Sequence, residues 1–164
     1  MKHKYYFISL LVFFACTANM CIKEDENCHK TINFVNNSKY ALYLGDSPYH
    51  PDTLFLTDFS SIVSQDKIYK VNSGETNRSA LVSYRSCLEG WFKPRHPHGL
   101  DTFIIFIFDA NVVENTPWNI VDKDYLILQR YDVSLEDLQH LSWTLSYPPS
   151  EAMKDMKMYP PYEK

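Results

Sequence analysis

The chain has 164 residues, of which 45% are hydrophobic and 15% aromatic, and this is enough to fold one domain of ordinary size around a core. Only 4 glycines occur, and no GxGxxG or GxxxxGK[ST] motif can be written, which excludes a glycine-rich phosphate loop. The formal charge of −4 and the lack of a basic stripe argue against a nucleic-acid partner.

The N-terminus has the pattern of a secretion signal. Lys2, His3 and Lys4 form a short basic region, and the apolar run YYFISLLVFFA follows it. A run of about eleven residues suits the hydrophobic part of a signal peptide and is too short to span a bilayer. The alternative is a buried N-terminal strand, which explains the basic start less well.

Two cysteines near the end of this leader are candidates for a lipid anchor. Cys16 follows the small residue Ala15, as lipoprotein signal peptidase requires, whereas Cys21 follows Met20. Yet the segment CIKEDE, which begins at Cys21, resembles the surface-export signal of Bacteroidales-type lipoproteins. Lipidation is therefore expected on Cys16 or Cys21, and ordinary cleavage after Ala18 is the alternative. The expected location is the cell envelope, on the periplasmic or the surface side of the outer membrane.

Export to an oxidising compartment allows disulfides to persist. Cys28 and Cys87 are the cysteines left beyond the leader, and we expect them to form one bridge that closes a loop of about sixty residues. The alternative is two reduced, buried thiols. No CxxC occurs, which argues against a zinc ribbon or a thioredoxin-type site, and no metal or cofactor is expected.

The rest of the chain favours short strands. We predict a hairpin over 30–45, an exposed loop over 46–53 (DSPYHPDT), and two strand pieces on either side of Ser73-Gly74. DTFIIFIFDA has the continuous apolar run of a central strand that is buried on both faces. DYLILQRYDV predicts another strand. SLEDLQHL predicts a short helix with Ser134 as its N-cap and Asp137 near the capping-box position, and SWTLSYP predicts the last strand.

These elements predict an all-β protein, a β-sandwich of immunoglobulin-like or related type with one or two short helices. The expected division is a signal peptide and anchor region over 1–21, a short acidic tether over 22–30, the β-sandwich domain over 31–150 and a C-terminal tail over 151–164.

Three segments carry a resemblance to a known family. INFVNNS, FIFDA and the block ILQRYDVSLEDLQHLSWTLSYPP are similar to a family of small Bacteroidales-type cell-envelope lipoproteins of unknown function. The resemblance covers most of the chain beyond the leader, and the block over 126–149 is its most specific part. It implies a lipid-anchored envelope protein and carries no catalytic residue across.

Candidate binding residues cluster in LEGWFKPRHPHG. His96 and His98 would share a face on a strand and could reach one metal, but the flanking prolines favour a solvated loop. Trp91 lies beside this loop, and Trp91, His96 and His98 are the candidates for surface recognition of a protein or glycan. Thr53, in DTL, resembles the O-glycosylation acceptor of Bacteroidales-type envelope proteins.

No catalytic residue is assigned. Asp132, Glu136 and Asp137 could suggest paired carboxylates for glycoside cleavage, but acids at a helix start favour a structural role there. The favoured function is a non-enzymatic binding or structural module of the envelope. The alternatives are a glycan-acting hydrolase and an inhibitor or immunity-type partner, for which a small acidic domain would suit a basic target.

Overall fold

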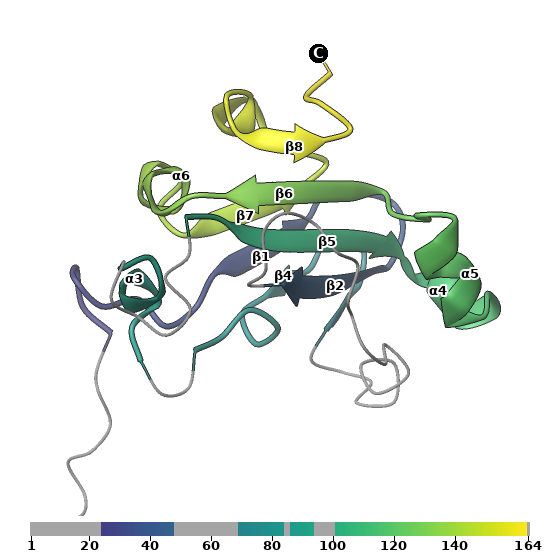
Figure 1. The fold of residues 1–164 in the computed structure, drawn as a ribbon, viewed down its shortest axis with the longest axis horizontal. Helices are drawn as coiled ribbons and strands as arrows, with labels where there is room; N and C mark the ends of the chain where they lie inside the picture. The colour runs from purple at the N-terminus through teal and green to yellow at the C-terminus, as the bar shows by residue number, and fades with distance from the viewer. Residues whose placement is uncertain (1–23, 48–68, 84–85, 94–100, 164) are drawn as a thin grey trace, which may run out of the picture.

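The computed structural model describes residues 24–47, 69–83, 86–93 and 101–163. Its strands form a three-stranded sheet in the order β4-β1-β7 and a five-stranded sheet in the order β3-β2-β5-β6-β8. The fold is all-β and sandwich-like with short helices, as the sequence predicts (Figure 1). The elements in chain order are β1 (Asn33–Asn36), β2 (Leu42–Ser47), β3 (Lys70–Val71), β4 (Thr76–Asn77), α3 (Leu88–Trp91), β5 (Phe103–Asp109), α4 (Ala110–Asn115), α5 (Trp118–Lys123), β6 (Gln129–Val133), α6 (Leu135–His140), β7 (Thr144–Tyr147), a 3₁₀ turn (Glu151–Met153) and β8 (Lys157–Tyr159).

Strand β5 is the centre of the larger sheet, which confirms the prediction made from its apolar run. It pairs antiparallel with β2 on one side and with β6 on the other. All six residues from Phe103 to Phe108 are buried. Because successive side chains of a strand point to opposite faces, β5 contributes to a hydrophobic cluster on each side of the sheet.

The two clusters follow this alternation. Phe103, Ile105 and Ile107 of β5 join residues of β1, β6 and β7 in the core between the sheets. Ile104, Phe106 and Phe108 join Val113 of α4 and Val121 of α5 on the outer face of the larger sheet. Figure 1 places α4 and α5 at one end of the molecule and α3 and α6 at the other.

The hairpin predicted over 30–45 is wrong. Strand β1 pairs parallel with β7 and antiparallel with β4, whereas β2 belongs to the other sheet. The buried side chain of Asn36 accounts for the crossing, because its amide donates to the carbonyl oxygens of Tyr40 and Val71 at 2.7 and 2.9 Å. These bonds hold the chain in a bend where it leaves one sheet for the other.

The tail predicted over 151–164 also needs correction. Residues 157–159 form β8, which pairs antiparallel with β6 at the edge of the larger sheet, so SWTLSYP is not the last strand. Asp132 of β6, whose side chain has no exposed area, forms ion pairs with Arg130 and Lys157 at 2.8 and 3.0 Å. Asp132 therefore fastens β8 to the sheet and does not open the following helix.

Helix α6 begins as the sequence predicts. The hydroxyl of Ser134 accepts a hydrogen bond from the backbone N–H of Asp137, and the Asp137 carboxylate accepts one from the backbone N–H of Ser134, which completes a capping box. Leu138 is fully buried in the core. Trp143 follows the helix in a left-handed backbone conformation (φ 57°) and is 5% exposed.

Replacing Trp143 by Ala should therefore lower the free energy of unfolding by about 3–5 kcal/mol, the usual cost of deleting a large core side chain. Ser134→Ala should cost only about 1 kcal/mol, the usual value of an N-cap. Thermal melts of the two variants and the wild type measure both. A Trp143→Ala variant that melts like the wild type but no longer binds its partner would assign this residue to recognition instead.

Candidate functional site

Five of the candidate residues from the sequence lie outside the described residues: Cys16, Cys21, Thr53, His96 and His98. The expected disulfide is confirmed. Cys28 and Cys87 are bonded, with their Cα atoms 4.9 Å apart and a sequence separation of 59. In the chain-entropy model, a bond that closes a loop of this length stabilises the fold by about 4 kcal/mol.

The bridge corrects the tether predicted over 22–30. Asp25 and Cys28 form a small backbone bridge, and the carboxylate of Glu24 accepts a 2.7 Å hydrogen bond from the N–H of Lys30. Cys28 itself is buried, and its sulfur is bonded to the residue that precedes α3. Residues 24–30, here called the N-terminal segment, are therefore folded on themselves and attached to the domain through Cys28.

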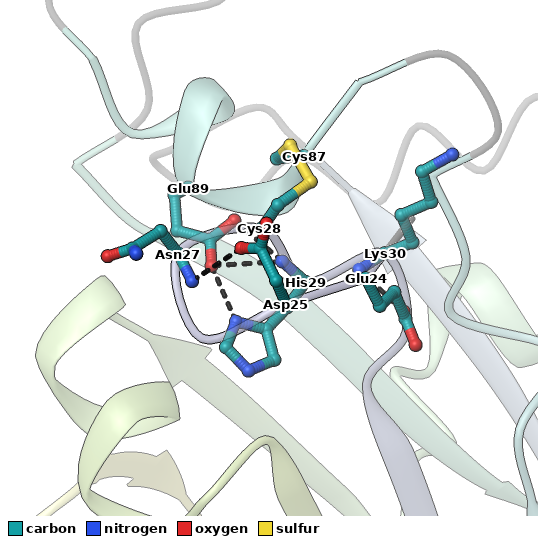
Figure 2. A network of polar contacts seen from close by, with 8 residues as sticks. All are labelled: Glu24, Asp25, Asn27, Cys28, His29, Lys30, Cys87 and Glu89. Atoms are coloured by element: carbon teal, nitrogen blue, oxygen red, sulfur yellow. Dashed lines mark hydrogen bonds and ion pairs between the residues drawn. A yellow bond between two sulfur atoms is a disulfide. The ribbon is translucent and has the colours of Figure 1, made fainter. Parts of the chain in front are cut away.

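A histidine–glutamate pair lies beside this bond. The carboxylate of Glu89, on α3, accepts hydrogen bonds from the backbone N–H of His29 through both oxygens at 3.0 Å. The same carboxylate contacts the Nδ1 atom of His29 at 2.6 Å. Figure 2 shows Glu89 between the backbone and the ring of His29, next to the disulfide.

Trp143 fixes the other side of the histidine. The imidazole of His29 stacks on the Trp143 ring with centroids 4.2 Å apart and planes 13° from parallel. A ring that is held by a carboxylate at one edge and by an aromatic face has little freedom to turn. The pair of His29 and Glu89 is thus held in a defined position at the surface, where the two side chains are 30% and 16% exposed.

These residues line a cleft of about 820 Å³, here called the N-terminal cleft, between the N-terminal segment, α3 and α6. Its polar lining includes the carboxylates of Glu24, Glu26 and Glu89. Its amide side chains come from three separate parts of the chain, namely Asn27, Asn33 and Gln139. Such convergent polar groups around an aromatic floor are typical of binding sites.

The chemistry of the pair suits orientation better than catalysis. A carboxylate at Nδ1 favours the proton on that nitrogen and leaves Nε2 as a hydrogen-bond acceptor, as in a general base. The hydroxyls of the cleft belong to Thr31 and Ser142. Within the described ranges, neither hydroxyl is hydrogen-bonded to His29, so the structure pairs this histidine with no nucleophile.

Two of the three carboxylates of the cleft likewise hold the chain. Glu24 and Glu89 both accept backbone N–H groups of the N-terminal segment. In the part of the chain that the structure describes, no group of three or more His, Cys, Asp and Glu side chains could hold a metal ion.

Trp91 faces a different hollow from the one that contains His29. Its ring is partly buried, donates from Nε1 to the Ser86 hydroxyl at 3.0 Å and meets Phe103 edge-on. It lines a second, smaller cavity that also contains Asp46.

Comparisons with known proteins give no relative. No protein-family model, no curated protein and no solved structure matches the chain. Among the described helices, none combines the length and the apolar character needed to cross a membrane.

Sequence reasoning missed the pair of His29 and Glu89. The two residues are 60 positions apart and neither lies in a motif. The signal that could have found them is the disulfide, because Cys28 directly precedes His29 and Cys87 lies two positions before Glu89. A bond between the cysteines brings their neighbours together.

Glu89→Gln should lower the free energy of unfolding by about 1–2 kcal/mol, because the neutral amide loses the charge-assisted bonds to the backbone and ring of His29. Glu26→Gln is the matched control, since Glu26 lines the same cleft but is exposed. Urea unfolding of both variants measures the difference. Equal midpoints for the two variants would contradict a structural role for the pair.

Proposed function

We propose that the protein is a lipid-anchored, non-enzymatic binding module of the cell envelope, which holds its ligand in the N-terminal cleft. The observation that carries the proposal is the cleft itself, in which carboxylates and amides from separate parts of the chain converge on the stacked rings of His29 and Trp143. The disulfide beneath it supports an exported location, because such bonds persist in oxidising compartments.

The short distance in sequence between the proposed anchor and the cleft supports a ligand close to the membrane. Glu24, which lines the cleft, comes three residues after Cys21 and eight after Cys16. At about 3.5 Å per fully extended residue, a lipid on either cysteine keeps the cleft within roughly 10–30 Å of the membrane. The ligand we propose is accordingly a membrane-proximal protein segment or glycan of the same envelope.

The resemblance of the block over 126–149 to small Bacteroidales-type lipoproteins agrees with this proposal. The block contributes α6 and Trp143, which form one wall and the floor of the cleft. On this proposal the block has two roles. Leu138 and Trp143 pack in the core, and the block also shapes the cleft.

A glycan-acting hydrolase is the second candidate, because the cleft is lined by more than one carboxylate. Glu24 and Glu89 already accept backbone hydrogen bonds, which is the arrangement of structural acids. Glu26 is the remaining carboxylate of the cleft that could act as a catalytic acid or base, and it is exposed. A hydrolase needs two carboxyl groups held on either side of the scissile bond, and the cleft leaves Glu26 alone for that role among its three carboxylates. The hydrolase therefore ranks below the binding module.

The anchor has a direct test. Processing of the full chain should be blocked by globomycin, and the mature N-terminus should carry a lipid on Cys16 or Cys21, as read by mass spectrometry. Cys16→Ser and Cys21→Ser, tested one at a time, decide which sulfur is used. A mature chain that begins with a free amine at Asn19 would contradict the anchor.

Ligand binding is tested with a photo-crosslinking amino acid at Gln139, an exposed amide that lines the cleft. Asn119 is the matched control, an exposed amide on α5 at the opposite end of the molecule (Figure 1). In intact cells, one defined product at Gln139 and none at Asn119 is expected. The captured glycan or protein should then remain intact when it is incubated with the purified protein, whereas cleavage that Glu26→Gln abolishes would favour the hydrolase.

A further inference from the structure

The second cavity, here called the Asp46 cavity, has a volume of about 290 Å³ and lies at the end of the core between the sheets. Apolar and aromatic side chains, among them Ile32, Leu88, Trp91 and Phe103, line it together with the polar residues Asp46 and Ser79. Asp46 is the one acidic or basic residue among the described residues that line it. A carboxylate in such surroundings needs an explanation, because burying a charge without a partner is costly.

The position of Asp46 follows from its strand. Residues 46–53 were predicted to form a loop, but β2 continues through Ser47, and Asp46 pairs in register with Ile105 of β5. Asp46 therefore has the same orientation as Leu42 and Leu44, which belong to the core between the sheets. Within the described residues, its carboxyl group makes no hydrogen bond or ion pair.

The surroundings also affect the ionisation of this group. Burial raises the pKa of Asp46 from 3.8 to about 6. The folded protein consequently binds this proton more tightly than the unfolded chain, so its contribution to stability is present below about pH 4 and is lost as the pH rises through about 6. Near neutral pH the carboxylate is mainly ionised and destabilises the free protein.

The aromatic walls are held in place. Trp91 lies on α3, which begins directly after the disulfide-bonded Cys87. The hydrogen bond of its Nε1 atom to Ser86 and its edge contact with Phe103, at 5.7 Å between centroids, fix the ring. Aromatic rings next to a carboxylate favour a cation, because both attract positive charge.

We propose that the Asp46 cavity binds an alkylammonium group, with the ammonium ion on the Asp46 carboxylate and the alkyl stem against the apolar walls. A hard metal ion fits less well, because it requires several oxygen ligands and the described lining offers one carboxylate. An anion would be repelled, and a neutral apolar ligand would leave the carboxylate without a partner. The ammonium ion supplies the missing charge and the stem suits the walls.

The alkylammonium group can come from a free amine or from the side chain of a lysine. Calorimetric titrations of the full chain with n-butylammonium and with N-acetyl-lysine amide distinguish the two sources, and n-butanol is the uncharged control. Binding of at least one cation and none of n-butanol is expected. If neither cation binds at millimolar concentration, the proposal is wrong.

Two variants assign the binding to Asp46. Asp46→Asn should weaken binding of the cation by at least about tenfold, because the charge-assisted bond is lost. Asp124→Asn is the control, since Asp124 is an exposed acid at the end of α5. Asp46→Asn should also raise the melting temperature near neutral pH and leave it unchanged near pH 4, because it removes a charge that only the ionised form carries. Equal affinity in the wild type and Asp46→Asn would overturn the proposal.

The wild type gives a measurement that does not depend on the folding of a variant. Affinity for the cation should fall as the pH is lowered through about 6, by roughly tenfold per unit below the pKa of Asp46. Tyr69 is the other titratable residue among the described lining. An affinity that stays constant between about pH 5 and 8 would contradict the role of Asp46. This result is separate from crosslinking at Gln139, because the two probe different hollows.

Discussion

The disulfide between Cys28 and Cys87 is the constraint on which both hollows depend. Helix α3 has only 4 residues, far fewer than a helix needs to be stable alone, and the bond fixes its first turn to the N-terminal segment. The helix then presents Glu89 to the N-terminal cleft and Leu88 and Trp91 to the Asp46 cavity. Reduction of one bond would therefore loosen both places where the protein could hold a ligand.

The sandwich supplies the rigid support for these sites. Strand β5 is buried on both faces, and the core between the sheets extends through Leu138 of α6 to Trp143. The hollows lie where short helices and loops meet the ends of the sheets, which is where proteins commonly place binding groups on a fixed scaffold. His29 shows this combination, because its ring stacks on a tryptophan that the core itself holds in place.

The sequence predicted the strands better than it predicted which strands pair with each other. The pattern over 30–45 indicated two strands correctly, but the turn residues between them suggested that the strands pair with each other. In the structure β1 pairs with β7, more than a hundred residues later, and the buried amide of Asn36 fixes the crossing between sheets. A polar residue such as Asn36 or Asp46 gives no local sign that its side chain lies in the core or lines a cavity, because its surroundings depend on strands that are remote in the sequence.

The sequence by itself determined the all-β class, the central strand β5, the capped helix α6 and the pairing of the cysteines, because each depends on local periodicity, on one cap or on the small number of cysteines. Only the tertiary structure decided that Glu89 holds His29, that Asp46 lines a cavity and that residues 157–159 form an edge strand of the larger sheet. These features join residues that are far apart in the chain, and the packing of the two sheets, not any local propensity, sets the distances between them.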